Sequence, residues 1–183
     1  KRALKRILEG EVHNIDCGKV NDRYFVNIFS FGLFATTSQR TLDSRKRRFG
    51  RMAYIAEGLR ELRHRKAIPL TIKSSGREFS ADILTALVFN GCTAGRLPLA
   101  RGSRPDDGIL DALFLLKRPL WRLMFDAVRH LCGGSPSSVI RVSGQHFTIT
   151  STERNILTDV DGQRGPSFPL RIECCPDKIK VVL

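Results

Sequence analysis

Short apolar or alternating runs, separated by turn-forming residues, make up most of the chain. Residues 83–90 are nearly all apolar, as in a strand buried on both faces, and residues 69–73 alternate between apolar and polar positions. Runs at this spacing predict a mainly β domain, either an antiparallel β-sandwich or a barrel-like arrangement of the same strands. Further strands are expected at residues 23–29, 77–80, 109–117, 139–142, 146–150, 155–160, 170–174 and 178–183.

Two inserted helices are predicted between the strands. Residues 120–132 carry apolar side chains at helical spacing, and Pro119 and Gly133 suit the start and the end of a helix. Its apolar stripe, which we expect to face the core, comprises Trp121, Met124, Phe125, Val128, Leu131 and Cys132. The second helix is expected over residues 49–65, although Gly58 falls inside it.

The charge of the chain narrows its possible partners. The formal net charge is +13, and residues 40–66 alone hold ten Lys or Arg against three acids. Such a positive field favours polyanions, namely nucleic acids, nucleotide phosphates or anionic lipid headgroups. The alternative is a solvated basic surface that only aids solubility. No apolar run approaches the roughly 18 residues that cross a bilayer.

Several kinds of site are not indicated by the sequence. The five cysteines form no C-x-x-C pair, and the four histidines have no metal-ligand spacing, so neither a disulfide framework nor a zinc site is predicted. Reduced thiols are the simplest account of the cysteines. Every Gly-rich phosphate-binding motif is also absent. The chain therefore has no evident means of its own for holding the phosphates of a nucleotide.

The first candidate for chemistry is the Asp161-Gly162 turn, which ends a predicted strand. A carboxylate at a strand end is held by the sheet, which suits a general base or a group that positions a hydroxyl. The alternative is an ordinary hairpin, since Asp-Gly is a frequent type I′ turn. A calcium loop is excluded because Phe168 occupies the position of its closing Glu.

A second acidic turn, Asp106-Asp107-Gly108, precedes the predicted strand at residues 109–117. Carboxylate and backbone oxygens in such a turn can bind a hard cation such as Mg²⁺. A plain turn is the simpler alternative.

At the other end of the sequence, residues 1–9 resemble the last turns of a helix closed by Gly10. We therefore expect the chain to begin within a longer protein, with residues 10–183 as its β-sandwich domain.

Taken in order, these motifs resemble the C-terminal half of the bacterial diacylglycerol kinase family, lipid kinases related to sphingosine and ceramide kinases. The resemblance spans almost the whole chain and is specific only as a set. Its four blocks are Ile15-Asp16-Cys17-Gly18 with Asn21 to Asn27 and Ser30-Phe31-Gly32; Gly50 to Ile55; Val88 to Gly91 with Ala94-Gly95 and Pro105 to Asp111; and Asp161-Gly162-Gln163.

The resemblance implies an ATP-dependent lipid kinase of two domains that phosphorylates a lipid hydroxyl such as that of diacylglycerol. The first, nucleotide-binding domain would hold ATP and Mg²⁺. Residues 10–183 would be the second domain, a β-sandwich that binds the lipid, and residues 1–9 the end of the linking helix. The partners implied are this N-terminal domain, the lipid substrate and an anionic membrane surface. The implied location is cytoplasmic, with peripheral association to the membrane.

Individual roles also follow from the resemblance. Asp161 matches the catalytic aspartate, and Gln163 stands where the family usually has Glu. Asp107 matches the side chain of a structural Mg²⁺ site completed by the backbone carbonyls of Arg104 and Ile109. The candidates for an acyl-chain pocket, with a role in the core as an equal alternative, are Phe29, Phe31, Leu33 and Phe34.

Two other functions fit the same sequence. The chain could be a non-catalytic basic β-domain that binds anionic lipid or nucleic acid, or part of an enzyme related to NAD kinases. Nucleic acid is the less favoured partner, because aromatic residues make up only 8% of the chain and do not interleave with the basic run. Two further departures from the family pattern, Gly95-Arg96 and Arg101, lie in the loop between Gly91 and Pro105 and bear on its shape.

Overall fold

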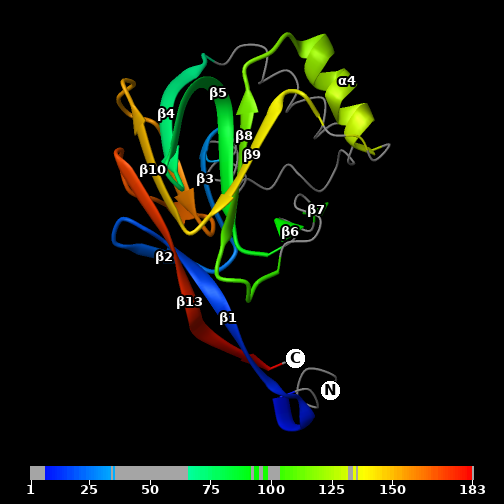
Figure 1. Cartoon of the computed structure of the whole chain (residues 1–183), viewed down its shortest axis with the longest axis vertical. Coiled ribbons are helices and arrows are strands. Elements are labelled where there is room, and N and C mark those ends of the chain that lie inside the picture. The colour runs from blue at the N-terminus through cyan, green and yellow to red at the C-terminus, as the bar shows by residue number, and fades with distance from the viewer. Residues whose placement is uncertain are drawn as a thin grey trace, which may run out of the picture.

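The computed structural model describes residues 7–33, 35, 66–91, 93–94, 97–98, 104–131, 134 and 136–182. The helix predicted at residues 49–65, nearly all of the basic run at 40–66, and Phe34 lie outside these residues. Residues 7–9 are helical and lead into the first strand. Both termini lie at one end of the molecule, and helix α4 (Leu120–Leu131) lies at the other (Figure 1).

Eleven antiparallel strands form one continuous sheet that folds over itself into two layers. The first layer contains β12 (Gln163–Arg164), β11 (Thr158–Val160), β3 (Ile28–Gly32), β5 (Arg77–Phe89), β8 (Leu110–Leu116) and β9 (Val139–Gly144). The second contains β4 (Ile68–Ser74), β10 (His146–Ser151), β13 (Leu170–Val182), β1 (Val12–Val20) and β2 (Arg23–Phe25). A separate two-stranded sheet is formed by β6 (Thr93–Ala94) and β7 (Leu97–Pro98).

Strand β5 belongs to both layers and joins them. Its first half pairs with β4, from Arg77 opposite Ser74 to Ile83 opposite Ile68. Its second half pairs with β3 and β8, and the register with β8 shifts between Ile83 and Thr85. A register shift of this kind bends a strand, so β5 can pass from one layer to the other. The prediction of a mainly β, antiparallel sandwich is confirmed.

The core fills the space between the layers. Because side chains alternate across a strand, every second residue of β3, β5 and β8 points inward. The fully or almost fully buried cluster comprises Val20, Phe25, Phe29, Phe31, Leu70, Ile72, Ile83, Ala86, Val88, Leu110, Ala112, Phe114, Phe147, Ile149, Val160, Leu170 and Ile172. Phe31 lies within it, with its ring centroid 5.2 Å from that of Phe168 and 5.9 Å from that of Phe29.

Several strand boundaries differ from the prediction. The single strand expected at residues 23–29 is divided into β2 and β3 by a bend at Val26 and Asn27. The strands expected at 77–80 and 83–90 are one strand, β5, and those expected at 170–174 and 178–183 are one strand, β13. Strand β1 was not predicted, because its polar and glycine residues give no clear alternation. All of its nine residues except Asp16 pair with β13 instead, so long-range pairing decides its structure.

Helix α4 confirms the predicted element but not the predicted orientation. Trp121, Met124 and Phe125 are exposed, whereas Leu123 and Asp126 are buried. The inward face is fixed by Asp126, whose carboxylate accepts a hydrogen bond of 2.7 Å from the Ser138 N–H just before β9. The expectation that the stripe faces the core is therefore wrong for these three apolar residues. The side chains of Val128 and Leu131, and all of Cys132, lie outside the description.

The Asp126 contact makes a pH-dependent contribution to stability. Hydrogen bonds from Ser138, and then from Ser137, lower the pKa of Asp126 from 3.8 to about 2. A lowered folded-state pKa adds stability that is fully present above pH 4 and is lost as the pH falls towards 2. We expect Asp126→Asn to have a lower urea midpoint than wild type at pH 7. The difference should narrow between pH 4 and pH 2.5, and a constant difference would contradict this assignment.

Candidate functional site

Asp161 lies in a two-residue hairpin turn between β11 and β12. Val160 pairs with Gln163 across the hairpin, and the backbone φ angles of Asp161 and Gly162 are +48° and +90°. Positive φ at both central residues is the type I′ geometry, which glycine adopts without a steric penalty. The carboxylate of Asp159 accepts the Gly162 N–H at 2.8 Å and supports the turn. The hairpin interpretation is thus confirmed. The geometry of this turn sets the position of the Asp161 side chain.

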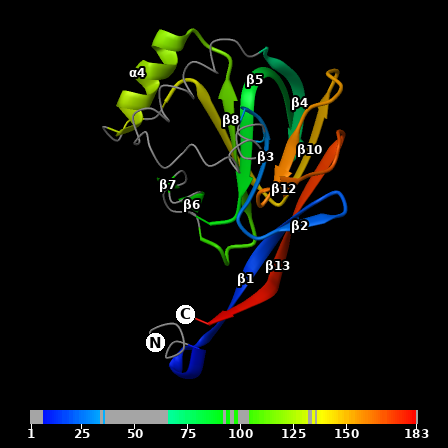
Figure 2. The same cartoon turned by 180° about the vertical axis from the view of Figure 1, so that it is seen from behind.

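The Asp161 carboxylate is held by three backbone N–H groups. Oδ2 accepts from Val26 at 2.7 Å, and Oδ1 accepts from Asn27 at 3.1 Å and from Ile28 at 2.8 Å. Val26 and Asn27 form the bend between β2 and β3 that divides the strand expected at residues 23–29, and Ile28 begins β3 (Figure 2). Asp161 nevertheless remains exposed. Its carboxylate is therefore fixed in direction while still open to a ligand.

The second acidic turn is held by internal contacts. The Asp107 carboxylate accepts the backbone N–H groups of Arg104 and Ile109, each at 3.2 Å. The guanidinium of Arg104 donates two hydrogen bonds, of 3.0 and 2.9 Å, to Asp106. This contact lowers the pKa of Asp106 and neutralises its charge locally. Asp107 is left as the exposed carboxylate of the turn without a cation beside it in the described contacts.

Two residues that belong to the motif blocks, but to which the sequence analysis gave no role, fix this turn to the sheet. Asp16 of β1 is buried, and its carboxylate accepts the N–H groups of Gly108 at 2.6 Å and of Asp177 at 3.0 Å. Its own N–H donates to the carbonyl of Pro105 at 2.8 Å. The Asn90 amide donates to the same Pro105 carbonyl at 3.2 Å and to that of Asp16 at 2.8 Å. The sequence signal that could have pointed to Asp16 was its charged side chain between the two apolar residues Ile15 and Cys17.

Replacing Asp16 should loosen this turn. In Asp16→Asn, the new amide group faces an N–H donor in a buried site, so at least one donor loses its partner. We expect the free energy of unfolding to fall by about 2–3 kcal/mol. Urea titration followed by circular dichroism measures this. Asp82→Asn, at an exposed aspartate of β5, is the matched control and should stay within about 0.5 kcal/mol of wild type. Equal, small effects would show that Asp16 has no such role.

The strand register places both acidic turns at the same end of the first layer. The Asp161 N–H donates to the carbonyl of Ile28 at 2.9 Å. Ile28 pairs with Phe89, and Phe89 pairs with Asp111, which follows the second turn. Because neighbouring strands lie about 4.8 Å apart, the row from Asp161 to Asp111 spans roughly 14 Å. The two acidic turns, about fifty residues apart in the sequence, therefore lie at the same end of the sheet.

The other predicted site residues are placed as follows. Gln163 is exposed on β12, two residues beyond Asp161. Phe29 and Phe31 are fully buried and pack in the core, so the core alternative describes their position here. Phe34 lies outside the described residues. An acyl-chain pocket at these positions therefore stays a prediction.

Burial first, and then carboxylates near the second acidic turn, suppress the reactivity of the Cys174 thiol. Burial, followed by the charges of Asp16 and other groups that include Asp107, raises the pKa of Cys174 to about 12. Burial raises the pKa of Cys17 as well. A thiolate is the form that attacks electrophiles or binds metals. Both thiols therefore stay protonated at neutral pH and are poor candidates for a nucleophile.

Among the residues that the structure describes, no three His, Cys, Asp or Glu side chains gather as a metal site.

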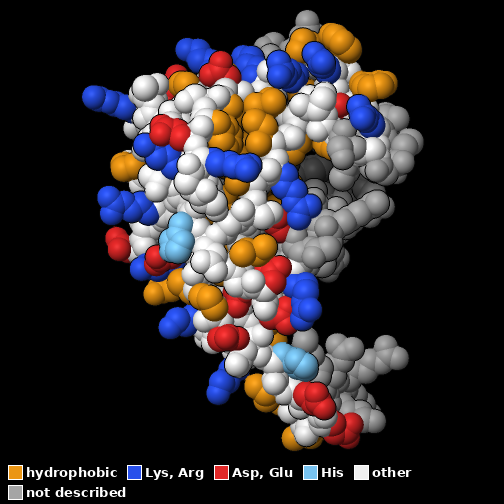
Figure 3. Space-filling view, in the orientation of Figure 1, with side chains coloured by type: hydrophobic (Ala, Val, Ile, Leu, Met, Phe, Trp, Pro, Cys, Tyr) orange, Lys and Arg blue, Asp and Glu red, His pale blue; other side chains and the backbone are white. Residues whose placement is uncertain are grey.

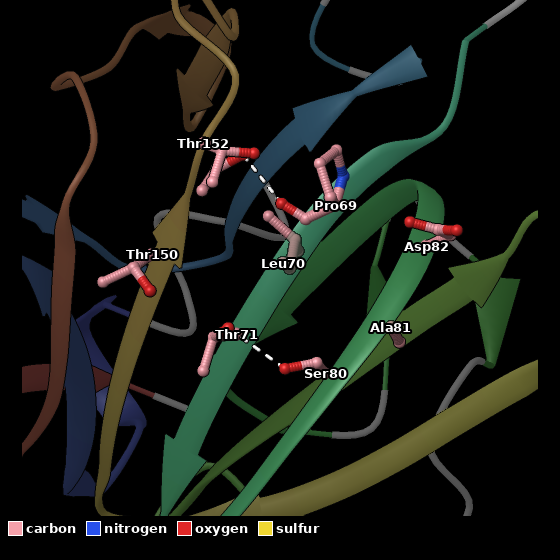
Figure 4. A pocket seen from close by; sticks show the side chains of 9 residues that line it. Pro69, Leu70, Thr71, Ser80, Ala81, Asp82, Thr150 and Thr152 are labelled. Carbon is pink, nitrogen blue, oxygen red and sulfur yellow. Dashed lines mark hydrogen bonds between the residues drawn. The ribbon is translucent and has the colours of Figure 1, made fainter.

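Three cavities lined by described residues lie on the surface of the sheets, and the smallest, of about 450 Å³, is lined by Ile109 next to the second acidic turn. Another, of about 520 Å³, is lined by hydroxyl side chains of β4, β5 and β10, with Thr71 and Ser80 hydrogen bonded at 3.1 Å (Figure 4). The third, of about 580 Å³, reaches the β11–β12 hairpin through Thr158 and Arg164. This cavity adjoins the hairpin carrying Asp161, and Arg154 also lines it.

Comparison with known proteins relates the chain to kinases. The profile of the family described as "YegS C-terminal NAD kinase beta sandwich-like domain" matches residues 27–183. A protein named diacylglycerol kinase from Staphylococcus aureus (strain bovine RF122 / ET3-1) is 34% identical over 173 residues, covering 91% of this chain and 54% of that protein. The chain thus spans little more than half the length of this relative.

Solved structures agree with the fold. A "putative diacylglycerol kinase" from Bacillus anthracis str. Sterne superposes with a TM-score of 0.75 at 22% identity, over 97% of this chain and 58% of that one. A second diacylglycerol kinase structure from the same organism gives a TM-score of 0.66 at 17% identity. At these identities the superpositions show a shared fold.

Proposed function

Because the chain belongs to the family of YegS C-terminal NAD kinase beta sandwich-like domains, we propose that it is the substrate domain of an ATP-dependent lipid kinase. The enzyme transfers the γ-phosphate of ATP to a lipid hydroxyl, such as that of diacylglycerol. The S. aureus relative named diacylglycerol kinase, of which the chain covers 54%, supports this substrate class. ATP and its Mg²⁺ are bound mainly by an N-terminal nucleotide-binding domain of the same protein.

The observation that carries the proposal is the fixed carboxylate of Asp161. Phosphoryl transfer depends mainly on positioning and on stabilisation of charge. Three amide hydrogen bonds hold the carboxylate at one edge of a rigid sheet, so its direction does not need to be set when substrate binds. Asp161 accepts a hydrogen bond from the lipid hydroxyl and takes its proton during attack on the γ-phosphate. Gln163, close by on β12, is an uncharged hydrogen-bonding group for the same substrate.

The second acidic turn fits a structural Mg²⁺ site. Asp107 is exposed and, unlike Asp106, is not paired with a guanidinium in the described contacts. Its carboxylate and the backbone carbonyls of Arg104 and Ile109 are the oxygen ligands that hard cations prefer. When bound, Mg²⁺ supplies positive charge that compensates the carboxylates of this acidic turn. Asp16 and Asn90 position the turn that would hold it.

The proposed enzyme works at a membrane surface. No helix among the described residues is long and apolar enough to span a bilayer. The net charge of +13 complements an anionic leaflet, towards which each nearby cation contributes on the order of 1 kcal/mol. As the resemblance to lipid kinases implies, we propose a cytoplasmic protein that associates peripherally with the membrane containing its lipid substrate.

A second candidate, phosphorylation of a nucleotide such as NAD, is favoured by the family description, which includes NAD kinase. A substrate panel separates the two. The complete protein, with its preceding domain, is incubated with Mg²⁺ and ATP labelled on the γ-phosphate, and is offered diacylglycerol in mixed micelles or NAD in solution.

We expect label in the lipid fraction only. Label in NAD would overturn the lipid assignment, and no transfer to either would leave the non-catalytic binding function as the better account. The 183-residue chain alone, tested in parallel, should transfer no label, because no phosphate-binding loop is present in it.

A further inference from the structure

Helix α4 exposes three large apolar side chains. The exposed fractions of Trp121, Met124 and Phe125 are 70%, 49% and 63%. Positions i, i+3 and i+4 of a helix share one face, so these three side chains form a single patch, which we call the α4 patch. Large apolar side chains grouped on a surface mark a contact with a partner or a membrane, whereas single exposed ones are ordinary.

The exposed charged side chains that the structure describes on helix α4 and directly before it are arginines. Arg118, Arg122 and Arg129 are exposed on the helix or directly before it. Asp126 is the acidic residue of the helix, and it is buried against Ser138 on the inward side. Hydrophobic and Lys or Arg side chains accordingly lie next to one another at the α4 end of the molecule (Figure 3). Apolar residues that include Trp, flanked by arginines, are typical of helices that lie in a membrane interface.

Charge and position together identify the partner. Two copies of this chain meeting symmetrically at the α4 patch would place arginines against arginines, which opposes association. Anionic headgroups instead complement these arginines, while the acyl boundary accepts the apolar side chains. The helix also lies at the end of the molecule away from both termini, so it can meet a flat surface (Figure 1).

We propose that α4 docks the protein on anionic phospholipid bilayers, with Trp121, Met124 and Phe125 inserted at the interface and Arg118, Arg122 and Arg129 on the headgroups. The choice of a membrane partner follows the proposed function, but the contact itself is independent of kinase chemistry. It assigns the docking to an element that is separate from Asp161 and from the basic run at residues 40–66.

Trp121 is the only tryptophan of the chain, so its fluorescence reports on the α4 patch itself. The 183-residue chain is titrated with vesicles of phosphatidylglycerol and phosphatidylcholine, and separately with phosphatidylcholine alone. We expect a blue shift of the emission, and quenching by brominated acyl chains, with the anionic vesicles only. Raising the salt concentration should weaken the binding.

Variants test which side chains are responsible. Met124→Ser with Phe125→Ser should lower the vesicle partition coefficient at least tenfold, and Arg122→Glu should lower it for anionic vesicles. Tyr24→Ser, which removes an exposed aromatic side chain of β2, is the matched control and should bind as wild type. Circular dichroism checks that each variant is folded.

Three results would overturn the proposal. The first is no change of the Trp121 emission with anionic vesicles, and the second is an equal response to neutral vesicles. A blue shift that depends on protein concentration without lipid would instead identify a second copy of the chain as the occupant. Vesicle binding requires no ATP, so its failure is distinguishable from failure of the proposed kinase activity.

Discussion

Asp161→Asn in the complete protein is expected to lower kcat for lipid phosphorylation about 10²- to 10⁴-fold, the range of general acid–base catalysis. Asparagine keeps the shape of the side chain, and its oxygen can still accept an amide hydrogen bond. It has no negative charge and cannot take the proton of the lipid hydroxyl. The KM for ATP should change little, because the proposal assigns ATP binding mainly to the other domain. Steady-state assays with diacylglycerol micelles measure both constants.

The control for this prediction is the fold of the variant. Asp161 is exposed, so the N–H groups of residues 26–28 can bond to water when the carboxylate is lost, and the protein should remain folded. Asp22→Asn, in the exposed turn between β1 and β2, is a matched substitution that should leave kcat unchanged. A variant at Asp161 that is folded and retains more than one third of wild-type kcat would refute the catalytic role.

Phe31→Ala is expected to have the largest effect on stability. Phe31 is fully buried, and its ring packs edge-on against Phe168 at 5.2 Å. Truncation of a buried Phe costs about 3–5 kcal/mol, because contacts are lost and a cavity remains. Native domains are stable by only about 5–15 kcal/mol, so much of the variant should be unfolded at 37 °C. Urea titration at 25 °C measures the change.

Substitutions of graded size make the Phe31 result specific. Phe31→Leu should cost less than Phe31→Ala, because it leaves a smaller cavity. Tyr24→Ala, at an exposed aromatic residue, should be within about 0.5 kcal/mol of wild type. The alternative role of Phe31, lining an acyl pocket, predicts a different result. In that case Phe31→Ala would remain folded and would change the preferred acyl-chain length in the kinase assay.

The fold class followed from local patterns, but the strand pattern was incomplete. Alternation and turn residues located β4, β8, β9 and β10 well, because each is bounded by Gly, Pro, Asp or Ser. Strand β1 gave no local signal, since its conformation is set by pairing with β13, whose paired residues are 152 to 170 positions away. The stripe of α4 was assigned to the core because periodicity identifies an apolar face but not the direction in which it points.

The candidate site was predictable in its residues but not in its contacts. Asp-Gly turns revealed Asp161 and Asp107, because a carboxylate beside a glycine at a strand end is a local feature. The anchoring of Asp161 by residues 26–28 depends on donors more than 130 positions away, which no local pattern contains. The role of Asp16, which joins β1 to the second turn and to β13, was missed for the same reason.

The central claim is that the fixed carboxylate of Asp161 faces the γ-phosphate of an ATP held by the preceding domain. The most direct measurement is a crystal structure of the complete protein with Mg²⁺ and a non-hydrolysable ATP analogue. A hydroxyl oxygen must fit between the two groups, at hydrogen-bond distance from the carboxylate and about 3–3.5 Å from phosphorus. We predict an Asp161 oxygen within roughly 7 Å of the γ-phosphorus, the sum of these two distances. A closed, nucleotide-bound structure in which Asp161 lies more than about twice that distance from the γ-phosphate would contradict the account.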